Sequence, residues 1–160
     1  MDLALISDKV LFATEPFESV YKEAKPLLEL HFQEIAKNKD LLSAPNPSME
    51  VYNQAVKEGK LLLITARSAW RLVGYFLWIM IRHSHYQHVI VAEEDLHYLL
   101  PEYRRGMTGY LLMKYACQVA SNNGAGMLIA REKVGHEHPA LMQRLGFIPT
   151  DIVYCRVAGE

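Results

Sequence analysis

Two arginines and two glycines are gathered in the segment Arg104–Tyr110. The apolar run before this segment, Leu96–Leu100, is bounded by Pro101 and predicts the end of a strand. The residues after it repeat at helical spacing, as Leu112, Tyr115, Ala116 and Val119. The start of a helix presents unpaired backbone N–H groups and the positive end of the helix dipole, and glycines let a ligand come close to them. The segment therefore predicts an anion site suited to a phosphate or a pyrophosphate, with Thr108 as helix N-cap; the alternative is a surface turn with solvated arginines.

Three consecutive acidic residues, Glu93, Glu94 and Asp95, fall in the middle of a strand predicted for Val89–Leu100. A carboxylate there is a candidate general base, because it can accept a proton directly or through a water molecule. Side chains alternate along a strand, so Glu94 is expected on one face and Glu93 with Asp95 on the other. The alternative is that the acidic run marks a β-bulge or an exposed edge.

Histidines and cysteines are the remaining residues that could do chemistry. His83, His85 and His88 lie close in sequence, but their positions do not converge clearly and no cysteine is nearby, so we expect no metal site. These histidines are expected to line a groove beside the acidic strand. The two cysteines, Cys117 and Cys155, are expected to be small core residues in a reducing compartment.

Composition bounds the class of protein. A chain of 160 residues, 51% of them apolar and 22% charged, fits one globular domain spanning residues 1–160. The formal net charge of −1 gives no general attraction to nucleic acid or to an anionic membrane. The start of the chain, Met1–Lys9, does not resemble a signal peptide, and the apolar run Leu72–Ile81 is too short to span a bilayer. We therefore expect a cytoplasmic protein.

Hydrophobic periodicity predicts a mixed α/β domain with a central, mostly antiparallel sheet of six or seven strands and about four helices. The expected strands are Val10–Ala13, Lys60–Ala66, Arg71–His83, Val89–Leu100, Met127–Ala130 and Ile152–Val157. The expected helices are Phe17–Asn38, Met49–Glu58 capped by Ser48, Thr108–Asn123, and a short one opened by His138-Pro139 and ended by Gly146. Pro26 makes the first of these either a kinked helix or two short ones. The near-continuous hydrophobicity of the hairpin formed by residues 60–83 suggests that both faces of the sheet are covered.

The segment around Arg104 resembles the coenzyme A signature of the GNAT N-acetyltransferases, Arg/Gln-x-x-Gly-x-Gly/Ala. Arg104 takes the first position of the pattern and Gly109 the last. Met107 stands where the family usually has its middle glycine, and Gly106 is one residue earlier. The segments Leu141–Phe147 and Leu72–Tyr75 are similar to the closing helix–Gly–Phe element and to the Leu-Val-Gly strand of the same family.

The resemblance implies a GNAT fold and acetyl-CoA as the acyl donor. It implies that the pantetheine arm pairs with the backbone of Tyr98, Leu99 and Leu100, which also supplies an N–H to the thioester oxygen. The pyrophosphate would then rest on the turn and its arginines. The residues implied there are Arg104, Arg105, Gly106, Met107, Thr108, Gly109 and Tyr110.

The resemblance also implies catalytic roles. The family often has its general base on the strand before the cofactor turn, which favours Asp95 and then Glu94. Many members have a tyrosine as general acid where this chain has Met142, and Tyr154 is a possible substitute. His85 and Tyr86, with other details, look most like a subgroup common in tailed bacteriophages and their prophages. These two residues are expected to contact the acceptor.

The function expected from this resemblance is direct transfer of an acetyl group from acetyl-CoA to a primary amine in a ternary complex. The amine would belong to a small molecule or to a protein, and two copies of the chain could pair, as GNAT domains often do. If the protein comes from a phage, its place would be the bacterial host cytoplasm. The alternatives are a catalytically inactive protein that keeps the scaffold for binding or a phage structural role, and an effector that modifies a host or phage protein.

Overall fold

The computed structural model describes residues 5–7 and 9–158. Within them, six strands form one sheet in the order β1-β2-β3-β4-β5-β6. All neighbouring strands are antiparallel except β5 and β6, which are parallel. The strands are β1 (Leu5–Ser7), β2 (Val10–Thr14), β3 (Leu61–Ser68), β4 (Arg71–Arg82), β5 (Ile90–Leu99) and β6 (Met127–Ile129).

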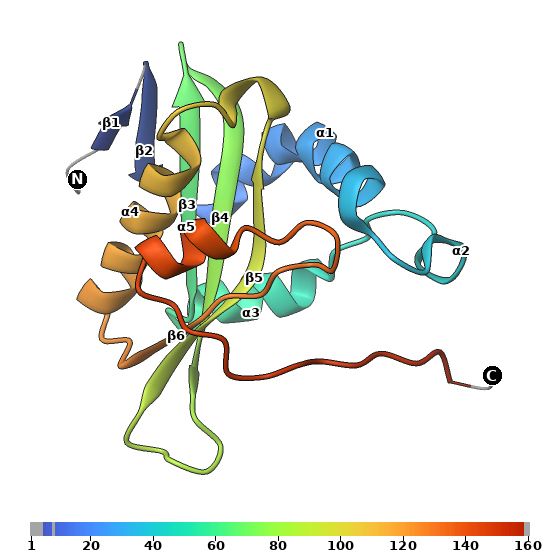
Figure 1. Ribbon diagram of the computed structural model, residues 1–160, viewed down its shortest axis with the longest axis vertical. Helices are drawn as coiled ribbons and strands as arrows, with labels where there is room; N and C mark the ends of the chain where they lie inside the picture. The colour runs from blue at the N-terminus through green and yellow to red at the C-terminus, as the bar shows by residue number, and fades with distance from the viewer. Residues whose placement is uncertain (1–4, 8, 159–160) are drawn as a thin grey trace.

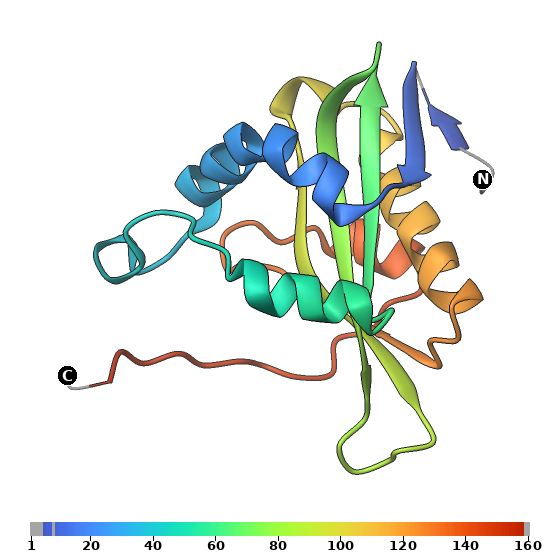
Figure 2. The ribbon, with the colours of Figure 1, turned by 180° about the vertical axis from the view of Figure 1, so that it is seen from behind.

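Helices cover both faces of this sheet. They are α1 (Phe17–Ile35), α2 (Lys39–Leu42), α3 (Met49–Lys57), α4 (Thr108–Asn122) and α5 (Pro139–Arg144), with a 3-10 turn at Pro101–Tyr103. Helices α1 and α3 lie on one face and α4 on the other, with α5 on the side of α4 (Figures 1 and 2). The mixed α/β class and the mostly antiparallel sheet are therefore as the sequence predicts.

Strand β4 is the centre of the core, because it is covered on both sides. Its residues from Leu72 to Trp78 are all buried. The indole Nε1 of Trp78 donates a hydrogen bond of 2.9 Å to the carbonyl of Ala116 on α4. Gly74 allows a close approach to β5, since a Cβ at this position would stand 2.7 Å from the carbonyl oxygen of Tyr98. The expectation that both faces of this hairpin are covered is confirmed.

The first helix continues through its proline. Pro26 lies inside α1, so the segment is one helix, and its buried stripe consists of Val20, Ala24, Leu27 and His31. Ser48 caps α3 as expected, because its hydroxyl accepts the N–H of Val51 at 3.5 Å. The short strand β1 was not expected from the sequence.

The predicted last strand, Ile152–Val157, is wrong. These residues form no strand, and the chain after α5 extends away from the body of the molecule (Figure 1). Tyr154 is 88% exposed, and Cys155 is exposed rather than in the core. A segment of high β propensity still needs a partner edge, and β6 is only three residues long. Cys117, by contrast, is half-buried, and its burial raises the pKa of its thiol to about 11.

None of the described helices is long and apolar enough to cross a membrane.

Candidate functional site

Strands β5 and β6 pair over a short stretch and then part. Their register joins Val91–Glu93 to Met127–Ile129 and ends there. Beyond this point Arg131 contacts β5, since its backbone N–H and guanidinium bond the carboxylate and carbonyl of Glu94 at 3.1 and 3.3 Å. No described strand pairs with β5 on this side from residue 95 to its end. The parting of the strands thus leaves a row of backbone groups open.

The register decides which backbone groups face this open edge. The N–H of Leu100 donates a 2.9 Å hydrogen bond to the carbonyl of Val73, so it points toward β4. Backbone groups alternate in direction along an antiparallel strand, so Tyr98 also faces β4, whereas His97 and Leu99 face the open edge. Of the three residues expected there, the structure places only Leu99 at the edge. His97 was not predicted to face this edge. Alternation shows which residues share a direction, but only the register with β4 shows which of them face outward.

Arg104 ties the end of β5 to α1. Its guanidinium donates to both carboxylate oxygens of Glu34, at 2.6 and 2.7 Å, and its Nε donates to the carbonyl of Leu99 at 2.7 Å. It also lies 5.2 Å from the ring centre of Tyr98. The hydrogen bonds from Arg104 lower the pKa of Glu34. The side chain of Arg104, expected to attract a pyrophosphate, is thus engaged with protein groups.

The start of α4 presents backbone N–H groups that have no partner within the helix. Met107 is the N-cap residue, and the first helical hydrogen bond runs from the N–H of Leu111 to its carbonyl, so the N–H groups of residues 108–110 precede that bond. Apart from its chain neighbours and the backbone of its own helix, a Cβ at Gly109 would meet no described atom within 4 Å. The expectation that Thr108 is the N-cap is wrong: Thr108 is the first helical residue, and its side chain is buried.

Two further cations lie near this corner. Arg105 is exposed. Arg144, on α5, places its guanidinium 4.5 Å from the ring centre of Tyr110 and donates to the sulfur of Met107 at 3.6 Å. The sequence carries no signal that would bring Arg144 to the start of α4, because the contact depends on how α5 packs.

The acidic run lies at a β-bulge, which is one of the alternatives that the sequence left open. Leu77 pairs with Leu96 and Trp78 with Glu94, so Asp95 is the extra residue of β5. Its carboxylate is exposed and accepts a 2.6 Å hydrogen bond from the hydroxyl of Tyr52 on α3. The bulge therefore turns Asp95 toward the face of the sheet that α1 and α3 cover.

The other two carboxylates have different partners. Glu94 is buried, and it bonds Nδ1 of His97 at 2.5 Å and the backbone of Arg131. Burial by itself would lower the pKa of His97, but the hydrogen bond and the charge of Glu94 outweigh it and raise the pKa. Glu93 forms an ion pair of 2.8 Å with Arg131. Asp95 is thus the exposed member of the run, and its partner is the hydroxyl of Tyr52.

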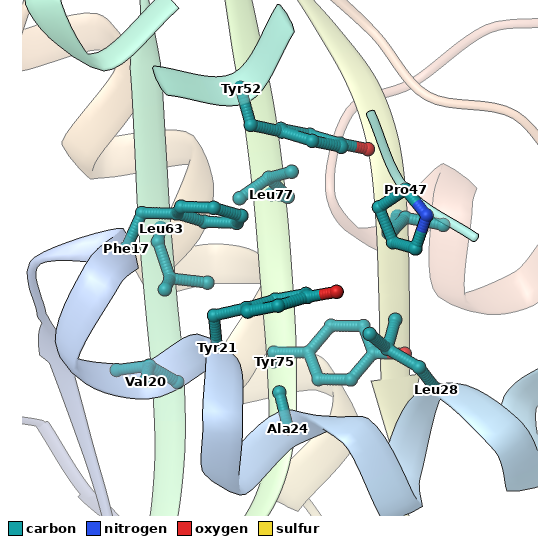
Figure 3. Close-up of a pocket in the computed structure, with 11 residues that line it drawn as sticks. Phe17, Val20, Tyr21, Ala24, Leu28, Pro47, Tyr52, Leu63, Tyr75 and Leu77 are labelled. Carbon is teal, nitrogen blue, oxygen red and sulfur yellow. The ribbon is translucent and has the colours of Figure 1, made fainter. Parts of the chain in front are cut away.

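An apolar cavity lies between the sheet and helices α1 and α3, and one of its lining residues is Tyr52, the hydrogen-bond partner of Asp95 (Figure 3). Its volume is about 40 Å³. The rings of Tyr21, Phe17 and Tyr52 form a stacked column along it, with centre-to-centre distances of 5.6 and 5.1 Å. The lining residues are Phe17, Val20, Tyr21, Ala24, Leu28, Pro47, Tyr52, Leu63, Tyr75, Leu77 and Leu96.

Three expected site residues lie elsewhere. His85 and Tyr86 are exposed in the turn between β4 and β5, which projects from the end of the sheet (Figure 2), and neither lines the cavity. Tyr154 lies in the exposed C-terminal segment. Among the described residues, no group of three or more His, Cys, Asp or Glu side chains is placed to hold a metal ion.

Comparison with solved structures identifies the fold. The chain is similar to an aminoglycoside acetyltransferase, meta-AAC0020, from an uncultured soil metagenomic sample, with 12% identity over 98% of this chain and 100% of that chain and a TM-score of 0.72. It is also similar to the ribosomal-protein-alanine N-acetyltransferase of Brucella melitensis biovar Abortus 2308, with 16% identity over 94% and 99% and a TM-score of 0.65. A third match is a predicted acetyltransferase of Clostridium acetobutylicum, solved with acetyl-CoA, with 11% identity over 92% and 96% and a TM-score of 0.67.

The chain therefore has the fold of the GNAT acetyltransferases. No model of a known protein family matches the sequence. No curated protein matches it either.

Proposed function

We propose that this protein is an acetyl-CoA-dependent N-acetyltransferase that acts on a primary amine by direct transfer in a ternary complex. The observation that carries the proposal is the unpaired edge of β5, which leads into the open start of α4. The edge offers backbone hydrogen-bonding groups to an extended chain, and the helix start offers them to an anion.

The described residues fit acetyl-CoA as a substrate. The N–H and carbonyl of His97 and the N–H of Leu99 would bond the amide-rich pantetheine arm, as an added strand would. The N–H groups of residues 108–110 and the side chain of Arg105 would receive the pyrophosphate. The free space at Gly109 would let the pyrophosphate come close to the backbone. The thioester supplies an activated acetyl group.

We assign Asp95 as the base. An alkylamine has a pKa of about 10.4, so near pH 7 only about one molecule in 10³ carries the lone pair needed for attack. Asp95 first takes the ammonium proton, directly or through water, and passes it on to solvent. The neutral nitrogen then bonds the acetyl carbon, and as the carbon–sulfur bond breaks, a second proton passes from the nitrogen through water to the departing sulfur. A backbone N–H of the open edge would stabilise the carbonyl oxygen, which is typically worth roughly 2.7–4 kcal/mol.

Calorimetry with acetyl-CoA tests the proposal, using a substitution that fills the helix start. Gly109→Leu should fold normally, because nothing lies within 4 Å of the new Cβ and leucine favours helix more than glycine. It should weaken acetyl-CoA binding by about tenfold or more, that is, by at least about 1.4 kcal/mol. Gln118→Leu places the same side chain at an exposed position further along α4 and should bind as the wild type does. A wild-type protein that fails to bind acetyl-CoA would overturn the proposal.

Binding of acetyl-CoA without turnover is the second candidate. It is favoured by the position of Tyr154, which lies in the exposed tail and not beside β5. Met142, which packs against the core, has no proton to donate. Release of free thiol across a broad panel of amines would distinguish the two functions, because only the enzyme produces it.

Finer assignments remain predictions. The likeness of His85 and Tyr86 to the phage and prophage subgroup, a cytoplasmic location, a pair of copies and a protein acceptor all follow from the sequence resemblance. An acetylation-proteomics comparison of cells with and without the protein tests the last of these.

A further inference from the structure

We infer that the acceptor is a small primary amine carrying a compact apolar group, either a branched alkyl chain or a single aromatic ring. The inference rests on the proposed function and names its substrate class. It depends on the apolar cavity beside Asp95, on the size of that cavity, and on the charge at its rim.

The cavity offers little to a polar substrate. Its lining is aliphatic and aromatic except for the hydroxyls of three tyrosines. The hydroxyl of Tyr52 is bonded to Asp95, and that of Tyr75 lies 2.9 Å from Nδ1 of His31. A sugar hydroxyl that entered this space would give up its water and gain few partners, which is unfavourable. An alkyl or aryl group has no hydrogen bonds to water to lose, and its transfer from water into the cavity is favourable.

The size of the cavity limits the apolar group. A single water needs roughly 10–15 Å³ of space measured in the same way. The volume of about 40 Å³ thus admits a group of a few heavy atoms, with a ring partly emerging at the mouth. Ala24 is the small residue of α1 at this wall (Figure 3). A wider, more polar hollow shares the lining residues Tyr21, Leu28 and Pro47 with this cavity.

The charge at the rim fixes the orientation of the amine. Asp95 is exposed, and it directly precedes Leu96, which lines the cavity. A protonated amine is attracted to this carboxylate while its apolar group lies between the aromatic column and β4. The nitrogen is then held next to the residue assigned as the base and close to the open edge of β5.

The test compares amines that carry an apolar group with amines that carry hydroxyl groups. Phenethylamine and isoamylamine should be acetylated with a kcat/KM at least about tenfold higher than that of ethanolamine or glucosamine, as expected where an apolar pocket discriminates by a few methylene groups. Saturation-transfer NMR should show contact between the protein and the alkyl or ring protons of the first two amines, and this measurement does not depend on turnover.

A matched pair of variants locates the preference. Leu28 is partly buried and lines the cavity, whereas Leu30 is 49% exposed on the same helix and does not line it. Leu28→Phe should lower the kcat/KM for phenethylamine by about tenfold without changing the affinity for acetyl-CoA. Leu30→Phe should behave as the wild type.

The outcomes separate the inference from the proposed function. Equal use of glucosamine and phenethylamine, equal effects of the two phenylalanine variants, or acetyl-CoA binding with no acetylation of either apolar amine would overturn the inference alone. Failure of the wild-type protein to bind acetyl-CoA would overturn the proposed function and the inference with it.

Discussion

The hydroxyl of Tyr52 donates a hydrogen bond of 2.6 Å to the carboxylate of Asp95, joining α3 to the bulge of β5. Burial and the neighbouring carboxylate both raise the pKa of Tyr52, so its hydroxyl stays protonated and remains a donor. The bond holds Asp95 at the rim of the apolar cavity, where an acceptor amine would lie. Asp95 differs in its partner from Glu93, which pairs with Arg131, and from Glu94, which is bonded to His97.

Replacing Asp95 should affect turnover and leave acetyl-CoA binding unchanged. Loss of a general base typically costs 10²–10⁴ in rate, so Asp95→Asn should lower kcat by about that amount. Tyr52→Phe, which removes only the positioning hydrogen bond, should cost about tenfold, and Glu93→Gln is the control. Steady-state kinetics and calorimetry measure these effects. An Asp95→Asn variant as active as Glu93→Gln would show that the base is elsewhere.

The ion pair between Arg104 and Glu34 should contribute modestly to stability. Both side chains are partly exposed, and exposed pairs are worth about 0.2–1 kcal/mol, although this one has two parallel hydrogen bonds. A double-mutant cycle with Arg104→Ala and Glu34→Ala, followed by urea unfolding, should give a coupling energy of about 1 kcal/mol. A coupling near zero would mean that the pair does not hold α1 to β5 in solution.

Stability should fall in mild acid because of His31. Burial lowers its pKa from 6.5 to about 4, so between these values the unfolded chain binds the proton more readily than the folded one. The free energy of unfolding should therefore decrease as the pH falls from about 6.5 toward 4, by about 3 kcal/mol in total. The raised pKa of His97 has the opposite sign, since its contribution is present below pH 6.5 and is lost as the pH rises.

Urea unfolding at several pH values, on the wild type and on His31→Phe, measures this slope. The ring of His31 stacks on that of Tyr98 with 5.0 Å between the ring centres, and phenylalanine keeps a ring at this position while removing the titration. As the pH is lowered from 7 to 5, the free energy of unfolding of the wild type should fall relative to that of His31→Phe. A constant difference would show that His31 is not the group responsible.

Removing the C-terminal segment should leave the fold intact. The side chains of Ile152, Val153 and Tyr154 are each at least 79% exposed, so a chain ending at Thr150 should lose at most about 0.5 kcal/mol of stability. The shortened chain should also turn over substrate as fast as the full chain, a result that would exclude Tyr154 as the general acid. Thermal unfolding and activity measure both. A loss of several kcal/mol would show that this segment packs against the domain in solution.

Patterns that repeat over a few residues were enough to predict most elements. The helix that begins at Phe17, the cap of α3 by Ser48 and the continuous hydrophobic run of β4 follow from spacing and residue type alone. The predicted strand after α5 was wrong, because β propensity is local whereas a strand requires an edge to pair with. The predicted cap at Thr108 was wrong, because the burial of that side chain is a tertiary effect.

The sequence by itself determined the order of the elements, the glycine and arginine corner at the start of α4, and the acidic run on β5. The tertiary structure decided which of these groups meet: Asp95 with Tyr52, 43 residues away, and Arg104 with Glu34, 70 residues away. It also decided that His97 and Leu99, and not Tyr98 or Leu100, face the open edge. The physical reason is that periodicity reports the burial of single residues, whereas a contact between distant residues depends on strand register, a one-residue bulge and the packing of helices on the sheet.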